Sequence, residues 1–402
     1  MVPAFPLSAT LESRFALRFA LGMKLYPTLR SLLIAALLAT IGCAHADHFV
    51  YVGTYTGAKS KGIYSCRMNS AGQFTSAELA AEITNPTYLA VHPNQKFLYA
   101  IGEISKFGDQ KAGSVSAFAI DATTGKLTPL NQQSSGGPGP CHIDVDRAGQ
   151  CVVVANYGGG SVEALPIKAD GSLGAPGTFI QHEGTSVNKS RQEGPHGHCI
   201  VVDPTQKFAL ACDLGLDKVL IYKLDPAQAT LTPNDPPFAA LAPGSGPRHL
   251  AFHPNGKFAY VISEMLCTMT AFQWDGSRGA LKEFQTISTV PGQVQKGFST
   301  AEVYVHPSGK FVYGSNRGHD SIVVYACEEK TGRLTLVEHQ ATQGKTPRHF
   351  ALDPSGRFLL AENQDSGSII VFRIDPKTGK LTPTGQKVEV GSPVCAVFVP
   401  VK

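Results

Sequence analysis

The chain has 402 residues, of which 43% are hydrophobic and 16% charged, as in an ordinary globular protein, and its length suits one large all-β domain. It carries 35 basic and 31 acidic side chains, and four of the basic and one of the acidic lie in residues 1–46. The remaining 31 basic and 30 acidic side chains give a net charge of +1, which offers no global field for nucleic acid or an anionic membrane surface.

The N-terminus has the features of an export signal. Lys24 and Arg30 precede an apolar run over residues 32–41, and the small-x-small motif Ala44-His45-Ala46 follows. This order is typical of a secretory signal peptide cleaved before Asp47. The apolar run is too short for a stable membrane span. We therefore expect an exported protein, periplasmic in a bacterium.

Residues 1–46 are interpreted as an N-terminal extension and signal, with the signal itself over 23–46, and residues 47–402 as one domain. The sequence leaves open whether translation starts at Met1 or Met23. A lipoprotein cysteine at Cys43 has weak support, because Thr40 stands where an aliphatic residue is expected.

Eight cysteines follow Cys43, scattered singly and without a CxxC pair. A zinc site or a redox couple therefore has little support. Most of these cysteines fall within strand-like runs, where cysteine behaves as a small apolar residue, so we expect buried free thiols. We expect no metal and no other cofactor.

The domain opens with two strand-like runs, residues 48–56 (HFVYVGTYT) and 62–68 (GIYSCRM). After them one phrase recurs: an apolar run, a turn of the form His/Asp-Pro-x-Gly, and an aromatic-rich apolar run. The anchors of these turns lie 47 to 57 residues apart and are Pro93, Arg147, Pro204, Pro254, Pro307 and Pro354. Repeats at this spacing predict an array of similar units.

Each repeat has room for four strands. The runs around the turn predict a hairpin of strands A and B. A β-branched and aromatic run follows as strand C, for example residues 321–327 (SIVVYAC) or 368–374 (SIIVFRI). A turn such as DPKTGKLTP, from Asp375, leads to a more polar fourth strand that starts at its Leu. The repeats show no useful helical periodicity.

The two ends of the array predict how it closes. Residues 48–56 resemble a B strand without its A, and residues 392–400 (SPVCAVFVP) resemble an A strand without its B. Joined, they complete a seventh unit. We predict an all-β fold: a seven-bladed β-propeller with four antiparallel strands per blade, closed by its terminal strands. A straight solenoid would need polar caps at both ends, and none is present.

The start of strand A and the end of strand B lie at the same end of each blade, so seven such ends converge on one face. Six residues before each turn anchor stand Thr87, Cys141, His198, Arg248, Ala301, Arg348 and Val394. Ten residues after it stand Glu103, Tyr157, Leu214, Glu264, Arg317 and Gln364, with Tyr55 in the closing blade. Titratable groups thus gather at matched positions, which favours a functional site there.

Four of these residues could hydrolyse an ester. His198 can take a proton from water, Glu264 can orient the water or relay the proton, and Arg248 and Arg317 can hold an anion and the oxyanion. The sequence has no GxSxG elbow, HExxH helix or P-loop, so a serine hydrolase, a zincin or a nucleotide enzyme has no motif behind it.

Three segments carry a specific resemblance: EGPHGHCIVVDP from Glu193, PGSGPRHLAFHPNGKFAYVISE from Pro243, and HPSGKFVYGSNRGHDSIVVY from His306. They resemble the bacterial 6-phosphogluconolactonase family of seven-bladed propellers, which includes the fungal carboxy-muconate lactonizing enzyme. The resemblance spans nearly all of residues 50–400. It implies a metal-independent lactonase of sugar metabolism, as in the pentose phosphate pathway, with His198, Arg248, Glu264 and Arg317 as catalytic or substrate-binding residues.

Further substrate-binding candidates are His196, Arg348, Asn316, Tyr157 and His142. His196 is the alternative base, since PHGH holds both histidines, and stacking the repeats favours His198. The polar insertion at residues 182–194 lies on the same face, where Lys189 or Arg191 could reach a phosphate; an ordinary surface loop is the alternative.

The expected partner is a small-molecule sugar lactone, phosphorylated or not, and the oligomeric state stays open. Two alternatives remain. The first is an exported propeller that binds a ligand or protein partner without turnover, since a fold does not fix a function. The second is a cycloisomerase that acts on a carboxylated lactone.

Overall fold

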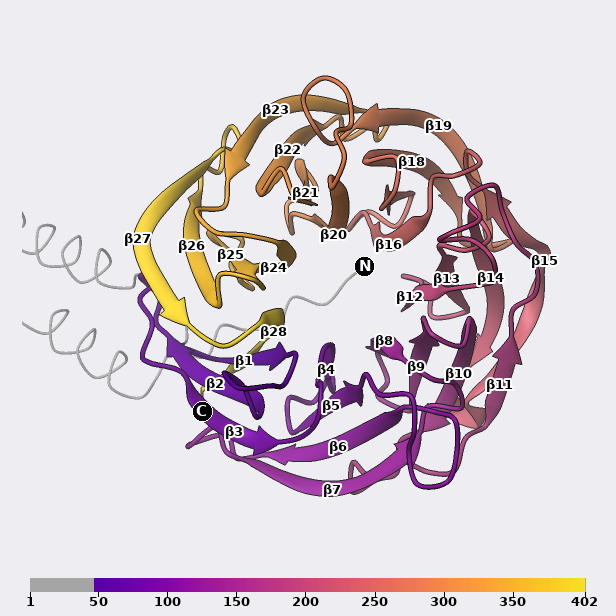
Figure 1. Ribbon diagram of the computed structural model, residues 1–402, viewed down its shortest axis with the longest axis vertical. Helices are drawn as coiled ribbons and strands as arrows, with labels where there is room; N and C mark the ends of the chain where they lie inside the picture. Colours follow the sequence, from indigo (N-terminus) through magenta and orange to yellow (C-terminus); the bar gives the residue numbers. More distant parts are fainter. Residues whose placement is uncertain (1–46, 402) are drawn as a thin grey trace, which may run out of the picture. The chain divides into compact units, whose positions relative to one another are not determined.

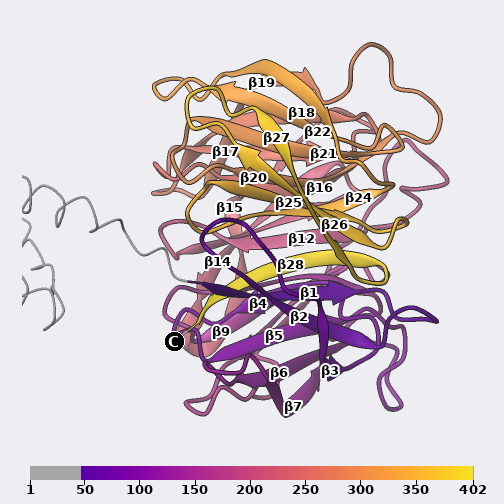
Figure 2. The same ribbon diagram turned by 90° about the vertical axis from the view of Figure 1, so that its left-hand side faces the viewer.

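The computed structural model describes residues 47–401, so the predicted signal segment lies outside the described residues. Residues 47–401 form seven four-stranded antiparallel sheets arranged in a ring (Figures 1 and 2). This confirms the predicted seven-bladed β-propeller. The described chain also contains one short 3₁₀ helix, η1 (Pro226–Gln228). No helix among residues 47–401 is long and apolar enough to span a bilayer.

The four strands of each blade succeed one another from the channel outwards. In that order, blade 1 consists of β28 (Pro393–Pro400), β1 (His48–Thr54), β2 (Gly62–Met68) and β3 (Glu78–Glu82). Blade 2 consists of β4 (Leu89–Val91), β5 (Phe97–Gly102), β6 (Ser114–Ile120) and β7 (Leu127–Ser134). Blade 3 consists of β8 (Pro140–Val145), β9 (Cys151–Asn156), β10 (Ser161–Pro166) and β11 (Thr178–Gln181). Blade 4 consists of β12 (Gly197–Val202), β13 (Phe208–Asp213), β14 (Lys218–Asp225) and β15 (Thr230–Ala240).

Blade 5 consists of β16 (Pro247–Phe252), β17 (Phe258–Ser263), β18 (Thr268–Asp275) and β19 (Ala280–Ser288). Blade 6 consists of β20 (Ser299–Val305), β21 (Phe311–Arg317), β22 (Ser321–Cys327) and β23 (Leu334–Ala341). Blade 7 consists of β24 (Pro347–Leu352), β25 (Phe358–Asn363), β26 (Ser368–Ile374) and β27 (Leu381–Glu389). The first strand of each blade borders the central channel (Figure 1).

The ring closes in blade 1, where the last strand pairs with the first. β28 runs antiparallel to β1 from the pair His48 and Pro400 to the pair Thr54 and Pro393. Figure 1 shows yellow β28 beside indigo β1. The prediction that the two termini complete one blade is therefore confirmed.

The apolar core lies between the blades. The buried apolar side chains of the described chain form seven main clusters, each shared by two neighbouring blades. All eight cysteines from Cys66 onwards are free, and all but Cys327 are buried, as the sequence predicted. Because each cluster draws on two blades, a single blade cannot bury its own apolar faces.

The repeated turns tie each blade to the next. Nε2 of His92, His253 and His306 lies 3.1, 2.8 and 2.8 Å from the carbonyl oxygens of Gly149, Gly309 and Gly356, each in the following turn. These glycines have φ values of 69° to 73°, which favour glycine. The turn histidines therefore link neighbouring blades. We call the face with these turns the lower face and the opposite face the upper face.

Candidate active site

A cavity of about 380 Å³ lies at the upper end of the channel. Its lining comes from the upper ends of inner strands, from the ends of second strands, and from one loop. The lining residues are Glu103, Cys141, Tyr157, Arg191, His198, Glu264, Ser299, Arg317 and Arg348. Of the four catalytic candidates, His198, Glu264 and Arg317 line this cavity. Arg248 lies beneath it, 2% exposed, beside a narrow space of about 10 Å³.

β-bulges place the inner-strand side chains. In β16, Pro247 pairs with Ser263 and His249 pairs with Ile262, so Arg248 is the extra residue. The same shift in register makes Cys141, His198 and Arg348 extra residues in β8, β12 and β24. A bulge redirects the side chain of its extra residue, and bulges are frequent beside active sites. The position six residues before each turn is thus special because the strand is irregular there.

Glu264 is surrounded by three guanidinium groups. Its Oε2 lies 3.1 Å from Arg248 Nε and 2.8 Å from Arg317 Nη2, and its Oε1 lies 2.7 Å from Arg191 Nη2. Burial opposes ionisation of this carboxyl, but the charges of Arg317 and Arg248 outweigh burial and hold its pKa well below the usual range. Glu264 is therefore ionised near neutral pH and anchors the three arginines.

The arginines differ in their surroundings. Arg248 Nη1 also donates to the Ala301 carbonyl at 2.6 Å, and burial lowers the pKa of Arg248. Arg317 Nη2 donates to the Thr300 carbonyl at 2.6 Å, and burial lowers the pKa of Arg317 to about 10. Arg317 still faces the cavity, whereas Arg248 is enclosed beneath it. Both remain charged at neutral pH.

His198 is a neutral imidazole. Burial and the nearby charge of Arg248 hold its pKa well below the ordinary value. Its Nδ1 lies 3.8 Å from the Cys141 sulfur, and that thiol donates to the His198 carbonyl at 3.3 Å. Burial raises the pKa of Cys141 well above its usual value, so the cysteine stays a thiol. His198 can therefore accept a proton at neutral pH.

His196 lies at the rim, two residues from His198. Its ring stacks on Tyr157 with centroids 4.6 Å apart, and its Nε2 lies 3.6 Å from the largely exposed carboxylate of Glu193. His196 Nδ1 lies 3.0 Å from the Tyr157 carbonyl oxygen. The structure thus brings His198, and not His196, into the lining of the cavity.

Arg348 belongs to a second polar cluster across the cavity. Its Nη2 donates to the Tyr55 hydroxyl at 3.1 Å, and that hydroxyl donates to Glu103 at 2.9 Å. Thr87 Oγ1 also donates to Glu103, at 2.6 Å. Tyr55, Thr87 and Glu103 occupy the two matched ring positions but were not among the predicted site residues. The cavity therefore presents four arginines, one of them beneath its floor, against two carboxylates.

The insertion at residues 182–194 reaches the cavity through Arg191, whose Nη2 also lies 3.3 Å from the Tyr157 hydroxyl. The loop is held at its start by His182, whose Nδ1 lies 2.6 Å from Asp213 and whose Nε2 lies 2.9 Å from the Tyr222 hydroxyl. Of the two predicted phosphate contacts, Arg191 lines the cavity, whereas Lys189 is exposed and is absent from the lining.

Two predicted substrate contacts do not reach this cavity. Asn316 is fully buried, and its Nδ2 donates to the Thr289 carbonyl at 2.8 Å. His142 follows the bulged Cys141 and lines a different cavity lower in the channel. Conversely, Ser299 lines the upper cavity although counting from the turn selected Ala301. Ser299 stands eight residues before the turn anchor, two residues outside the compared position, and the single extra residue of β20 leaves the count of six on Ala301 as in the other blades.

No three histidine, cysteine, aspartate or glutamate side chains among residues 47–401 are grouped so that they could hold a metal ion. The cavity instead combines one neutral imidazole, fixed positive charge and two carboxylates. This arrangement can activate a water molecule and stabilise a developing oxyanion.

Comparisons with known proteins agree with this chemistry. The family model described as "Lactonase, 7-bladed beta-propeller" matches residues 49–398. A 6-phosphogluconolactonase from Bacillus subtilis is 40% identical over 301 residues, which cover 75% of this chain and 83% of that protein. A 6-phosphogluconolactonase from Formosa agariphila is 33% identical over 308 residues, which cover 75% of this chain and 85% of that protein. A periplasmic gluconolactonase from Pseudomonas aeruginosa has a solved structure with a TM-score of 0.84 and 34% identity, covering 89% of this chain and all of that one.

Proposed function

The chain belongs to the lactonase family of seven-bladed β-propellers, and on that premise we propose that it hydrolyses an anionic sugar lactone. The excess of arginines over carboxylates at the cavity supports a negatively charged substrate. Two carboxylates, Glu103 and Glu264, are present there with four arginines: Arg191, Arg248, Arg317 and Arg348. An anion that entered the cavity would balance this excess of positive charge.

In the proposed reaction, His198 removes a proton from water while the water oxygen attacks the lactone carbonyl carbon. The carbonyl becomes an oxyanion, which the Arg317 guanidinium stabilises from the cavity wall. The bond between the acyl carbon and the ring oxygen then breaks, and His198 returns its proton to the leaving oxygen. The product is a hydroxy acid, which loses its own proton to solvent.

Glu264 serves this reaction as an anchor. A carboxyl whose pKa is held well below the usual range has no proton to relay near neutral pH, so the proton-relay role considered from sequence has little support. Its three ion pairs instead fix Arg317 and Arg191 toward the substrate, and Arg248 beneath them keeps the pKa of His198 low. This shared anchor holds the charged groups in place before substrate arrives.

Arg191 and Arg348 are suited to hold the anionic group of the substrate, a phosphate or a carboxylate. Arg191 is the more accessible of the two and lies on the loop that borders the cavity. Arg348 stands on the opposite wall with Tyr55. A phosphorylated lactone suits two arginines, because a phosphate accepts paired hydrogen bonds from a guanidinium group.

Export would favour a substrate outside the cytosol. The predicted signal peptide and the likeness to a periplasmic gluconolactonase support a periplasmic location and a wider set of lactones. We therefore propose an anionic sugar lactone as the class of substrate. The first compound to test is 6-phosphoglucono-δ-lactone, and unphosphorylated glucono-δ-lactone is the comparison.

A pH-stat assay of protein that starts at Asp47 tests this function, because each turnover releases one proton. We expect hydrolysis of both lactones, with kcat/KM for the phosphorylated one higher by roughly tenfold or more. Arg191→Ala should reduce that preference and spare the unphosphorylated lactone. Saturable binding of lactones without turnover would replace the proposal with a ligand-binding propeller, and conversion without net hydrolysis would indicate a cycloisomerase.

A further inference from the structure

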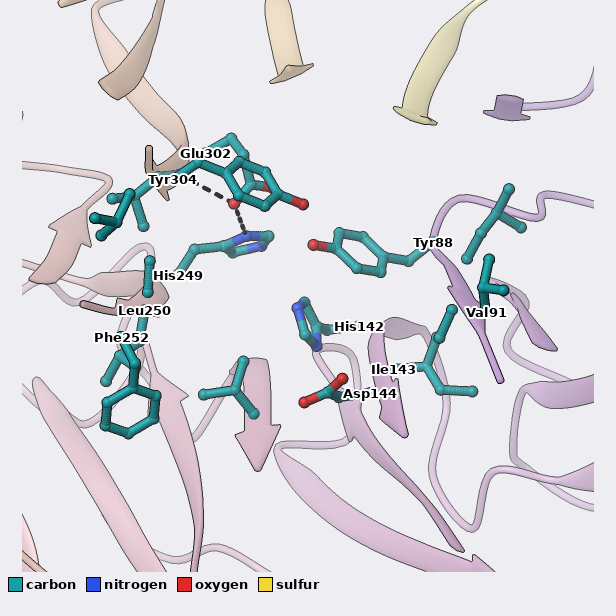
Figure 3. Close-up of a pocket in the computed structure, with 16 residues that line it drawn as sticks. Tyr88, Val91, His142, Ile143, Asp144, His249, Leu250, Phe252, Glu302 and Tyr304 are labelled. Atoms are coloured by element: carbon teal, nitrogen blue, oxygen red, sulfur yellow. Dashed lines mark hydrogen bonds and ion pairs between the residues drawn. The ribbon is translucent and has the colours of Figure 1, made fainter. Parts of the chain in front are cut away.

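The lower half of the channel holds a second cavity, of about 360 Å³. Figure 3 shows Tyr88, His142, His249, Glu302 and Tyr304 around a common centre, with Asp144 beyond His142. Between the lower and upper cavities lies a space of only about 10 Å³, which His198, Arg248 and His249 help to line. A molecule in the lower cavity would therefore enter from the lower face and would not share the lactone site.

The floor of the lower cavity carries hydrogen-bonding atoms without partners. His249 Nδ1 lies 2.8 Å from Glu302 Oε1, which also accepts from the Val303 amide at 3.0 Å. The other two polar atoms, His249 Nε2 and Glu302 Oε2, are buried and have no hydrogen-bond partner. His349 Nε2, 3.6 Å from Glu302 Oε2, is too distant for a hydrogen bond. Both His249 and Glu302 are 3% exposed.

The unpartnered atoms are acceptors when Glu302 is ionised. An ionised carboxylate can only accept, so it places the imidazole proton on His249 Nδ1 and leaves Nε2 with a free lone pair. Buried polar atoms without partners cost about 1 to 3 kcal/mol each, and a native protein normally satisfies them. Neither acceptor therefore has a hydrogen-bond donor within reach, although the Tyr88 and Tyr304 hydroxyls line the same cavity and His349 Nε2 is also unpartnered.

The lower cavity also lacks positive charge. Its lining includes Asp144 and Glu302 and contains no lysine or arginine. The guanidinium of Arg248 already binds Glu264 and the Ala301 carbonyl. Burial raises the pKa of Asp144 to about 6, although its oxygens accept hydrogen bonds from the Val145 and Val202 amides, and burial also raises the pKa of Glu302.

An apolar collar surrounds the route from the lower face to this floor. It is formed by the ends of four inner strands, at Val91, Val201, Phe252 and Val305. Deeper in, Tyr88 and Tyr304 direct their hydroxyl ends toward the centre, and Tyr304 lies beside Glu302 (Figure 3). The inner end of this cavity offers hydrogen-bond acceptors, and its entrance is apolar. It therefore fits a molecule with a hydrogen-bond-donating group at one end and a hydrocarbon chain at the other.

We propose that the lower cavity binds a small organic cation, a primary ammonium group on a short hydrocarbon chain, with Glu302 Oε2 and His249 Nε2 accepting its hydrogen bonds. An ammonium group offers three donors and one positive charge, which match the two unpartnered acceptors and the unbalanced carboxylates. The Tyr88 and Tyr304 hydroxyl oxygens can accept a further hydrogen bond from it. A metal ion fits less well, since no group of three potential ligands occurs among residues 47–401.

Titration calorimetry of the purified protein with n-butylammonium tests the proposal, with n-butanol and butyrate as probes of the same length. We expect saturable one-to-one binding of the ammonium and no saturable binding of the alcohol or the acid. Glu302→Gln keeps an acceptor for His249 but turns the second oxygen into an NH₂ donor, so it should weaken binding at least about tenfold. Glu329→Gln, in the exposed turn between β22 and β23, removes one negative charge away from the cavity and should bind like the wild type.

Thermal unfolding of each variant checks that it is folded. If Glu302→Gln does not fold, a crystal soaked with n-butylammonium decides the matter, because the nitrogen should lie within hydrogen-bond distance of Glu302 Oε2. Equal affinity for n-butanol, unchanged affinity in Glu302→Gln, or a soaked cation found elsewhere would each overturn the site. None of these outcomes depends on lactonase activity.

Discussion

Arg248 and His249 are neighbours in the chain, yet they serve opposite halves of the channel. In a regular strand, consecutive side chains point to opposite faces of the sheet. The bulge at Arg248 breaks this alternation, so its guanidinium reaches Glu264 while His249 contacts Glu302 below. One irregular residue thus gives β16 a contact with the upper site and another with the lower cavity.

The acid side of the pH profile depends on His198. A general base must be unprotonated, and burial with the charge of Arg248 lowers the pKa of His198 below its ordinary value of 6.5. Raising the pH through that lowered pKa should switch activity on, so log kcat/KM should be level at neutral pH and fall only below 6.5. A pH-stat or buffered assay series from pH 4 upwards measures this.

The control for this profile is the histidine at the rim. His198→Ala should lower kcat/KM roughly 10²- to 10⁴-fold and abolish the fall in activity on the acid side of the profile. His196→Ala should keep most of the rate and the same fall at low pH. If the fall in kcat/KM at low pH persists unchanged in His198→Ala, another group is the general base.

Glu264 should contribute stability that depends on pH. Its pKa in the folded protein lies well below the reference value of 4.5, so its ionised form stabilises the fold above pH 4.5, and that contribution is lost as the pH falls. Glu264→Gln leaves three guanidinium groups without their carboxylate and should lower the free energy of unfolding by about 3 to 5 kcal/mol at pH 7. Urea unfolding at pH 7 and pH 4 should show the deficit shrinking at the lower pH.

A surface glutamate provides the comparison for Glu264. Glu389→Gln breaks an exposed pair with Lys387 and should leave stability nearly unchanged at both pH values. A deficit in Glu264→Gln that stayed constant from pH 7 to pH 4 would mean that lost packing, and not lost charge, explains it.

At the scale of elements, the middle of the loop at residues 182–194 is bound by Asp217. Asp217, in the turn between β13 and β14, accepts hydrogen bonds from Ser186 Oγ at 2.6 Å, the Gly244 amide at 2.6 Å and the Gly246 amide at 2.7 Å. It therefore joins the Arg191 loop to the segment that leads into β16. The loop should depend on this residue for its order.

Asp217→Ala should raise KM for an anionic lactone roughly tenfold with less effect on kcat, because the ordering of Arg191 must then be completed on binding. Asp320→Ala is the matched control, since Asp320 stands before β22 as Asp217 stands before β14 and has a φ of 53° against 54°. The backbone strain of alanine is thus similar in both. Hydrogen exchange should increase over residues 182–194 in Asp217→Ala alone; equal exchange in the two variants would contradict this role.

The regular elements were predictable because their patterns are local. Third strands begin at Ser321 and Ser368, and fourth strands at Leu127 and Leu381, as predicted from β-branched runs and turn residues. The two matched positions of the repeats also predicted His198 and Glu264, which line the cavity. Sequence stacking therefore suffices for the architecture and for most residues that the repeats align.

The remaining features are irregular and leave no mark in the sequence. No glycine or proline occupies the bulged positions, such as Cys141 or Arg248, so the turning of His142 toward the lower cavity could not be foreseen. Counting six residues back from the turn selected the buried Ala301 and missed Ser299, which lies two residues farther from the turn. Asn316 is polar but donates to the Thr289 carbonyl, in the segment after β19, and to Ser321 Oγ of its own blade, which composition does not reveal.

At the scale of the whole molecule, stability is shared around the ring. Each apolar cluster belongs to two blades, and the second-strand tyrosines Tyr51, Tyr99, Tyr260 and Tyr313 donate to glycine carbonyls of the next blade at 2.8 to 3.0 Å. Opening the ring between β28 and β1 would leave blades 1 and 7 without shared packing. The closing pair should therefore govern the cooperativity of unfolding.

A disulfide across the closing pair should stabilise the protein more than one within a blade. Val52 and Ala396 are opposite each other in β1 and β28, and a cystine there would close a loop of almost the whole propeller. Ile369 and Val388, also buried and opposite in β26 and β27, would close a short hairpin. Chain entropy predicts gains of about 6 and about 3 kcal/mol for the oxidised over the reduced double-cysteine variants. Urea unfolding with and without reductant measures both. Equal gains at the two sites would show that the length of the closed loop does not decide the stabilisation.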